Sequence, residues 1–292
     1  MRARMRDGRK GWRWGVLMSG AFLAGLLAVG VALLLPGRGD REQGSVSPLS
    51  PATRATAPQL PPVEAPPALP RLAIVVDDLG YEPSRDAEWM KFPEKITVAV
   101  IPFGPSSRKV AESARAKGWG VVLHVPMEPE NPAPDRTEGF RLRRGMTGDE
   151  MESLLDRMIE DLPQAAGASN HMGSAFTADP EAMAAYVAVL GKKGLYLLDS
   201  VTTPGSVALE TALRAGVPAA RRDVFLDAGM KPGEMRLQWA RAIAIAKEKG
   251  AAVLICHGRA ETLSTILDLL PDLRKEKVQA VPLEELLQGK GV

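Results

Sequence analysis

The stretch LAIVVDDLG at residues 72–80 joins an unbroken apolar run to two carboxylates and a glycine. Apolar runs without polar alternation are typical of strands that are covered on both faces of a parallel sheet. Similar runs recur along the chain, at residues 96–101, 120–123, 195–198, 224–226, 251–255 and 278–281, and a weaker one lies just before Asn170. They predict a sheet of parallel strands that begins near residue 71.

Amphipathic stretches with helix signals separate these runs. Thr147 followed by Glu150 predicts a capping box at the start of one helix, and Asp179 before Pro180 predicts an N-cap with proline in the first turn. Repeated strand–helix units of this kind favour an α/β fold, a distorted or incomplete TIM-like (β/α) barrel. An open doubly wound sheet has the same local pattern and stays an alternative.

Composition limits the protein class. The 292 residues are 45% hydrophobic and 25% charged, which is typical of a globular protein and excludes a disordered or collagen-like chain. One cysteine, Cys256, excludes an intramolecular disulfide and a multi-cysteine zinc site. Residues 1–14 hold six of the 37 basic side chains and one of the 35 acidic ones, so the remainder is net acidic. A net acidic folded part argues against nucleic-acid binding.

The N-terminal region predicts a membrane anchor. Residues 15–35 are apolar and uncharged, and at about 1.5 Å per residue they can span about 30 Å of hydrocarbon. The basic segment 1–14 before them predicts a single-pass protein of the inner (cytoplasmic) membrane with a cytoplasmic N-terminus. A cleaved signal peptide is the alternative, although its apolar region is normally shorter.

Residues 36–70 form the predicted linker. They hold nine of the 24 prolines and no aromatic residue, a composition that cannot bury a core and favours extended conformations. The folded domain is therefore expected at residues 71–292, in the periplasm or extracytoplasmic space.

Polar residues follow the apolar runs directly. In α/β barrels the carboxyl ends of the strands carry the active site, although a strand-end Asp can equally cap the next helix. The side chains in these positions are Asp77, Asp78, His124, Asp199, Asp227 and His257. Several such positions together favour a site, and two of the three histidines of the chain are among them.

Asp78, His124 and His171 make a plausible set of ligands for a divalent cation, with zinc as the expected ion. Strand alternation would point Asp77 and Asp78 to opposite faces unless the chain turns, in which case one could ligate the metal and the other act as a base. Cys256 is expected to pack against helices, since it alternates with its neighbour on the strand. A phosphate-binding glycine loop, a G-x-S-x-G elbow and a CxxC motif are absent from the sequence, which disfavours nucleotide-binding, serine-hydrolase and thioredoxin-type functions.

Five segments together resemble the divergent polysaccharide deacetylase family, the YibQ-like proteins. They are VVDDLG at 75–80, LHVPME at 123–128, NHMGS at 170–174, LDS at 198–200 and ICHG at 255–258. The likeness covers about residues 71–287 and implies a distorted barrel of the NodB homology type, within the carbohydrate esterase 4 superfamily.

The resemblance also implies roles for residues of this chain. Asp77 matches the catalytic base, His257 the general acid, and Asp227 the acidic group that orients this histidine. Asp78 matches a metal ligand, whereas the paired histidines four residues apart that the family's relatives use are absent here. His124 and His171 are expected to replace them. The expected substrate-binding residues are Asn170, Ser174, Asp199 and Glu128, the last of which could instead be a solvated loop acid.

The implied function is a metal-dependent hydrolase that removes acyl groups, N-acetyl groups in particular, from an envelope polysaccharide or peptidoglycan. A non-catalytic glycan-binding or scaffold protein that retains the fold is the main alternative. A phosphodiesterase is a weaker one, because no basic cluster accompanies the motifs.

Overall fold

A computed structural model describes residues 68–131, 135–228 and 231–287. Three expected segments lie wholly or mostly outside these ranges: the basic segment 1–14, the anchor 15–35 and the linker 36–70, of which only the last three residues are described. Within the ranges, none of the helices combines the length and the apolar character that a membrane span requires.

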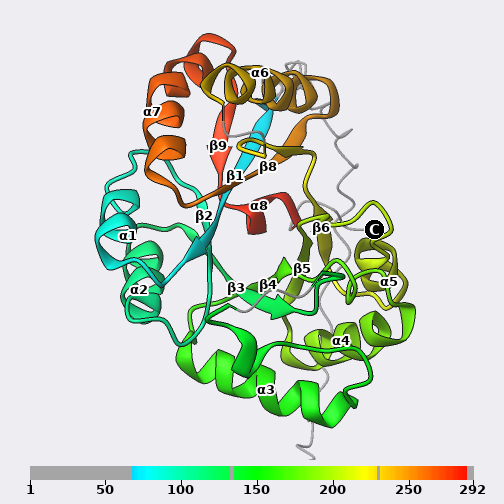
Figure 1. The fold of residues 1–292 in the computed structure, drawn as a ribbon. Helices are drawn as coiled ribbons and strands as arrows, with labels where there is room; N and C mark the ends of the chain where they lie inside the picture. The colour runs from blue at the N-terminus through cyan, green and yellow to red at the C-terminus, as the bar shows by residue number, and fades with distance from the viewer. Residues whose placement is uncertain (1–67, 132–134, 229–230, 288–292) are drawn as a thin grey trace, which may run out of the picture. The chain divides into compact units, whose positions relative to one another are not determined.

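Nine strands form one sheet in which every ladder is parallel (Figure 1). The spatial order is β6-β5-β4-β3-β2-β1-β8-β7, and β9 also pairs with β1. The strands are β1 (Arg71–Leu79), β2 (Thr97–Val100), β3 (Gly120–Met127), β4 (Gly167–Met172), β5 (Tyr196–Asp199), β6 (Ala219–Arg221), β7 (Val224–Phe225), β8 (Ala251–His257) and β9 (Gln279–Val281).

The sheet curls without closing. Its two end strands are β6 and β7, and within the described ranges no ladder joins them. This half-barrel confirms the predicted α/β class and the incomplete barrel, and it excludes the flat doubly wound alternative. β8 pairs with one side of β1. Two strands share the other side, where β9 pairs with residues 71–73 and β2 with residues 75–79.

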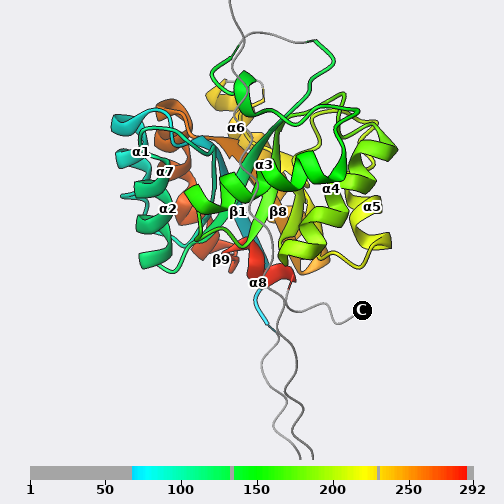
Figure 2. The same ribbon diagram turned by 90° about the horizontal axis from the view of Figure 1, so that it is seen from below.

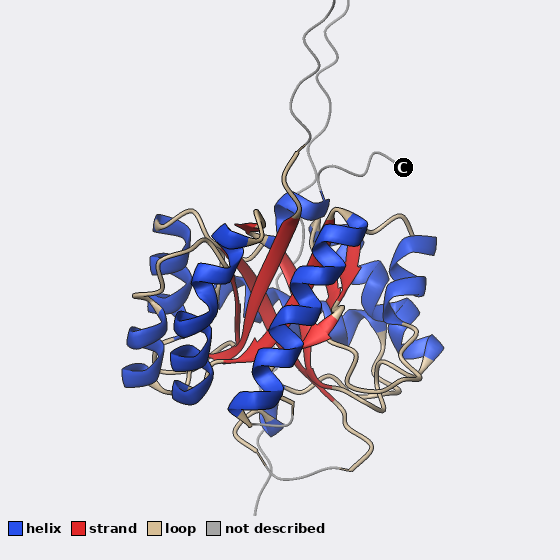
Figure 3. Ribbon diagram, turned by 90° about the horizontal axis from the view of Figure 1, so that it is seen from above, coloured by secondary structure: helices blue, strands red, loops and turns tan. Residues whose placement is uncertain are grey.

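Helices cover the outside of the curled sheet (Figures 2 and 3). They are α1 (Pro83–Trp89), α2 (Ser107–Ala116), α3 (Gly148–Asp161), α4 (Pro180–Lys193), α5 (Ala208–Arg214), α6 (Pro232–Lys249) and α7 (Ala260–Lys275), with a 3₁₀ turn η1 (Glu138–Phe140) before α3. The capping box of Thr147 and Glu150 and the N-cap of Asp179 are both present, as predicted. Cys256 is buried in the cluster between sheet and helices, also as predicted.

The short helix α8 (Leu283–Leu287) lies inside the curl (Figure 1). Leu283 and Leu286 join the inner apolar cluster, which includes Val75 and Ile255 on neighbouring strands. The Arg71 guanidinium donates to the Glu285 carbonyl at 3.0 Å, so α8 closes the interior at the amino end of β1. The carboxyl ends of the strands are left to carry the functional groups.

Most predicted strands are present, with extended carboxyl ends. β1, β3 and β8 run on through the polar residues that were expected just after them, as far as Leu79, Met127 and His257. The strand expected just before Asn170 includes this residue and His171. β6 was not predicted, since Ala219–Arg221 has three residues and no apolar run.

Candidate active site

A bulge in β1 places two neighbouring carboxyl groups on the same side of the strand. Asp78 has a left-handed backbone with φ 65°, and the pairing of β1 with β2 shifts register between Val76 and Leu79. Oδ2 of Asp77 and Oδ1 of Asp78 consequently lie 3.8 Å and 3.2 Å from Nε2 of His124. Simple alternation would have separated them.

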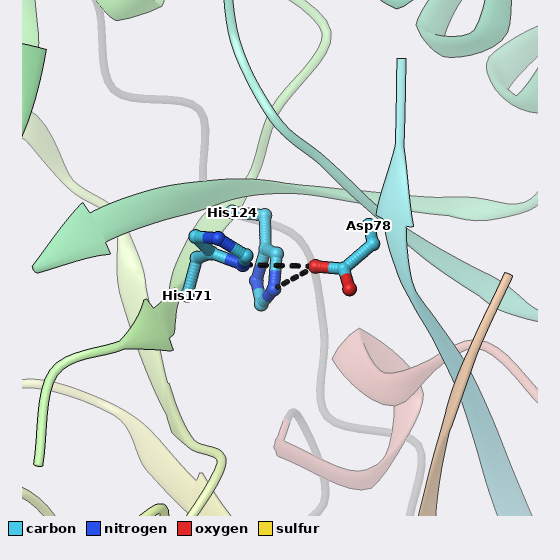
Figure 4. A group of neighbouring side chains, drawn as sticks. All are labelled: Asp78, His124 and His171. Carbon is cyan, nitrogen blue, oxygen red and sulfur yellow. Dashed lines mark hydrogen bonds and ion pairs between the residues drawn. The ribbon is translucent and has the colours of Figure 1, made fainter. Parts of the chain in front are cut away.

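Asp78, His124 and His171 meet at this point from β1, β3 and β4 (Figure 4). Oδ1 of Asp78 lies 2.8 Å from Nδ1 of His171 and 3.2 Å from Nε2 of His124, and the two imidazole centroids are 5.1 Å apart. One ligand atom from each side chain falls within 4.8 Å of the others. The structure thus brings together the three residues that the sequence suggested as metal ligands.

Ser169 fixes the orientation of the His124 ring. Its Oγ lies 2.8 Å from Nδ1 of His124, and the two residues are partners in the ladder of β3 and β4. The ring nitrogen Nε2 therefore faces Asp78. Ser169 was not predicted, because the register that pairs it with His124 has no signal in either strand alone.

Burial and hydrogen bonding set the protonation of this group. Burial alone would raise the pKa of Asp78, but hydrogen bonds with His124 and His171 hold the pKa of this carboxyl well below its usual range. Burial lowers the pKa of His124 to about 4. At neutral pH the Asp78 carboxylate is therefore ionised and the His124 imidazole is neutral, which are the forms that bind metals.

The donor set fits a divalent cation. Two imidazoles and one carboxylate are a ligand combination that zinc uses in catalytic sites, where three protein ligands leave a position open for water or substrate. Ser169 supplies the outer hydrogen bond that usually orients a ligating histidine. The residues present therefore fit a divalent cation.

Asp77 has a different environment from its neighbour. Its side chain is buried, and its Oδ1 has no hydrogen-bond partner among the described residues. Burial, followed by the charges of Asp78 and Asp227, raises the pKa of Asp77 well above its usual range, although the charge of Arg222 acts in the opposite direction. Two adjacent carboxyl groups with opposite pKa shifts are suited to different tasks, one holding a cation and the other accepting a proton.

His257 and Asp227 form a hydrogen-bonded pair beside this group. The Nδ1 of His257 lies 3.1 Å from Oδ1 of Asp227, and Nε2 of His257 lies 4.0 Å from Oδ2 of Asp78. Burial alone would raise the pKa of Asp227, but hydrogen bonds from His257 and Thr262, together with the charge of His257, lower it. Asp227 is thus an ionised acceptor that can orient the imidazole.

Asn170 and Asp199 are buried, and they hold the loops that follow β4 and β5. The Asn170 amide donates to the Met172 carbonyl at 2.8 Å, and its Oδ1 accepts from the Ser200 N–H at 2.8 Å. Asp199 accepts from the Val201 N–H at 2.8 Å and from the Ser206 hydroxyl at 3.0 Å. Their contacts are with the protein itself, and their contact with a substrate stays a prediction.

The Glu128 side chain braces the loop after β3, and Ser174 ties this loop to the one after β4. The Glu128 carboxylate accepts from the Arg144 backbone N–H at 2.8 Å and from its guanidinium at 2.8 Å, and this side-chain hydrogen bond lowers the pKa of Glu128. The Ser174 hydroxyl accepts from the Glu130 N–H at 2.9 Å. Substrate binding by these two residues also stays a prediction.

Arg222 is a further residue that sequence analysis missed. Its guanidinium donates to the carbonyls of Ser200 and Val201 at 2.5 Å and 2.7 Å, and it lies over the Phe225 ring at 5.1 Å. Its charge acts on Asp77. An arginine beside a short strand has no distinguishing pattern in the sequence, and only the curl of the sheet places it here.

Residues 74–287 match the family model of the divergent polysaccharide deacetylases. The chain belongs to this family. The uncharacterized protein YibQ of Escherichia coli is 34% identical to this chain over 215 residues, which are 72% of this chain and 67% of YibQ. An uncharacterized protein of Haemophilus influenzae is 34% identical over 222 residues, which are 76% of this chain and 78% of that protein.

The half-barrel also resembles a solved structure. The crystal structure of an uncharacterized protein from Agrobacterium tumefaciens superposes with a TM-score of 0.69 at 23% identity, and the match covers 75% of this chain and 89% of that chain. At this identity the likeness shows the fold alone, and the chemistry has to be argued from the side chains of this chain.

Proposed function

We propose that this divergent polysaccharide deacetylase is a metal-dependent hydrolase that removes acyl groups, N-acetyl groups in particular, from a cell-envelope carbohydrate. The observation that carries the proposal is the convergence of Asp78, His124 and His171 beside a buried Asp77 and an oriented His257. As part of it, we assign the half-barrel to the NodB type of the carbohydrate esterase 4 superfamily.

Asp78, His124 and His171 would hold the cation, with zinc as the expected ion. When bound, such an ion acts as a Lewis acid toward a carbonyl oxygen and lowers the pKa of water. The low pKa of Asp78 and of His124 keeps these two residues in their ligating forms at neutral pH, so that no proton has to be displaced from them.

Asp77 and His257 would carry the two proton transfers. The reaction consumes one water: its hydroxyl adds to the acyl carbon, and Asp77 accepts the proton that this water loses. The carbon–nitrogen bond then breaks, and His257 donates a proton to the departing amine. Asp77 is placed for this step by its buried position beside the cluster and its Oδ1 without a partner among the described residues, and Asp227 would stabilise the protonated imidazole.

The proposed setting is the cell envelope. An uncleaved anchor at residues 15–35 and a linker at 36–70 would place the domain at 71–292 in the periplasm, within reach of envelope polysaccharide or peptidoglycan. What supports this setting is the uncharged apolar run and the basic segment 1–14 in the sequence.

Acetate release from chitooligosaccharides and from peptidoglycan tests the proposal. The full-length protein should release acetate when zinc is supplied, and it should stop after treatment with a chelator. His257→Gln should retain its zinc and lose about a hundredfold or more in turnover. A zinc-loaded protein that is inert on every glycan would favour the glycan-binding or scaffold alternative.

A further inference from the structure

Asp86 is a buried acidic residue outside the proposed catalytic group. It lies on α1, its side chain is 1% exposed, and its Oδ2 accepts hydrogen bonds from the Gly80 N–H at 2.9 Å and from the Ser106 hydroxyl at 2.5 Å. Its Oδ1 has no partner among the described residues. Burying an incompletely bonded carboxyl group is unfavourable, so this group is poorly explained as a source of stability alone.

The contacts of α1 flank the turn that carries Asp78. Arg85, the neighbour of Asp86, donates to the Asp78 carbonyl at 3.3 Å, and Asp86 accepts from the N–H of Gly80 two residues later. Between these two bonds, the Leu79 carbonyl accepts from the Ile101 N–H at 2.9 Å. The backbone of residues 78–80 is thus held at three consecutive positions.

This turn needs such support. Asp78 has a left-handed backbone, which costs a non-glycine residue on the order of 1 kcal/mol and persists only when the surroundings enforce it. Gly80 has φ 117°, and a Cβ there would lie 2.4 Å from the Ser107 hydroxyl oxygen. The strained φ of Asp78 is what turns its carboxyl group toward His124 and His171.

We propose that Asp86 is a positioning residue that fixes the 78–80 turn and thereby aims the Asp78 carboxylate at the two histidines. Asp86 acts through the Gly80 N–H and does not contact the cation or the substrate. The inference rests on the proposed metal role of Asp78, and it predicts that Asp86 contributes to metal affinity separately from its contribution to folding.

Asp161 provides a matched control. At the end of α3, it is also buried, and its Oδ2 accepts from the Phe103 N–H at 2.7 Å in the loop after β2. Its Oδ1 pairs with Arg108 at 2.7 Å. Each aspartate accepts a backbone N–H just beyond a strand, but only the segment that Asp86 binds, the 78–80 turn, carries a proposed ligand.

Titration of the full-length chain with Co²⁺, followed by visible absorbance, tests the inference. Asp86→Ala should bind Co²⁺ about tenfold more weakly than the wild type, which is the usual effect of losing an outer partner of a metal ligand. Asp86→Asn keeps an acceptor oxygen for the Gly80 N–H and should recover most of the affinity. Asp161→Ala should melt at a lower temperature but bind Co²⁺ as the wild type does. Circular dichroism at the titration temperature establishes that each variant is folded.

Two results would overturn the inference. One is an Asp86→Ala variant that binds Co²⁺ as tightly as Asp161→Ala. Should Asp86→Ala fail to fold, Ser106→Ala replaces it: loss of the 2.5 Å bond to Asp86 should weaken Co²⁺ binding severalfold, and unchanged affinity would be the overturning result. A wild-type chain that binds no Co²⁺ would instead remove the metal role of Asp78 itself, and the proposed function with it.

Discussion

Asp227 binds both the side chain and the backbone of His257. Its Oδ1 lies 3.1 Å from the ring nitrogen Nδ1 of His257, and its Oδ2 accepts the His257 backbone N–H at 3.2 Å. The oxygen that accepts this N–H, Oδ2, also accepts a hydrogen bond from the Thr262 hydroxyl at 2.7 Å. The carboxylate is therefore locked, and it fixes both the position and the tautomer of the imidazole. This leaves Nε2 of His257 directed to the side of the site where Asp78 lies.

Asp227→Asn should lower deacetylation by about a hundredfold to ten-thousandfold, since an amide cannot stabilise the protonated imidazole. Turnover on chitooligosaccharides, measured across pH, checks this expectation, and zinc content should not change. Asp223→Asn is the matched control: Asp223 accepts the Val253 N–H at 2.9 Å at the other end of β8, away from the site. Equal turnover in the two variants would contradict the orienting role of Asp227.

Ser169→Ala should weaken zinc binding by about tenfold or more, because the His124 ring loses the group that orients it. Competition with a chromophoric chelator measures the change. Ser174→Ala removes a hydroxyl that serves only the Glu130 N–H among the described residues, so its zinc affinity should match that of the wild type. Zinc affinity that is insensitive to Ser169→Ala would mean that His124 is not a ligand.

Gly80→Ala should destabilise the domain by about 3 kcal/mol, because it adds a Cβ 2.4 Å from the Ser107 hydroxyl oxygen to a residue with φ 117°. Gly145 has φ 79° and open space where a Cβ would lie, so Gly145→Ala should lower the free energy of unfolding by only about 1 kcal/mol. Urea unfolding of both variants measures the difference. Similar losses would show that the packing around Gly80 is loose.

The local pattern of apolar and polar residues in the sequence predicted most of the fold, but fewer features of the site. The continuous apolar runs identify β1, β3 and β8, because strands covered on both faces need them. The meeting of Asp78, His124 and His171 also follows from strand ends that share one edge of a parallel sheet.

The geometry within the site depends on tertiary contacts. The left-handed backbone of Asp78 is held by Arg85 and Asp86 of α1, and the support of His124 by Ser169 depends on strand register. Neither contact has a local signal in the sequence. For the same reason β6, which is defined by its pairing with β5, was not predicted.

In the metal-free protein, the contribution of His124 to stability should fall as the pH falls from about 6.5 toward 4. Burial lowers the pKa of His124 to about 4 in the folded state, whereas an unfolded histidine has a pKa of about 6.5. Between these values the unfolded chain binds the additional proton, so the free energy of unfolding decreases with decreasing pH, by about 3 kcal/mol from this residue.

Asp77 acts in the opposite direction, because its raised pKa favours the folded state as it becomes protonated. Urea unfolding in the presence of a chelator, at pH 7.0 and pH 4.5, should therefore show that acidification destabilises His124→Asn less than the wild type, or stabilises it more. An equal dependence in both proteins would mean that His124 is not held neutral in the folded state.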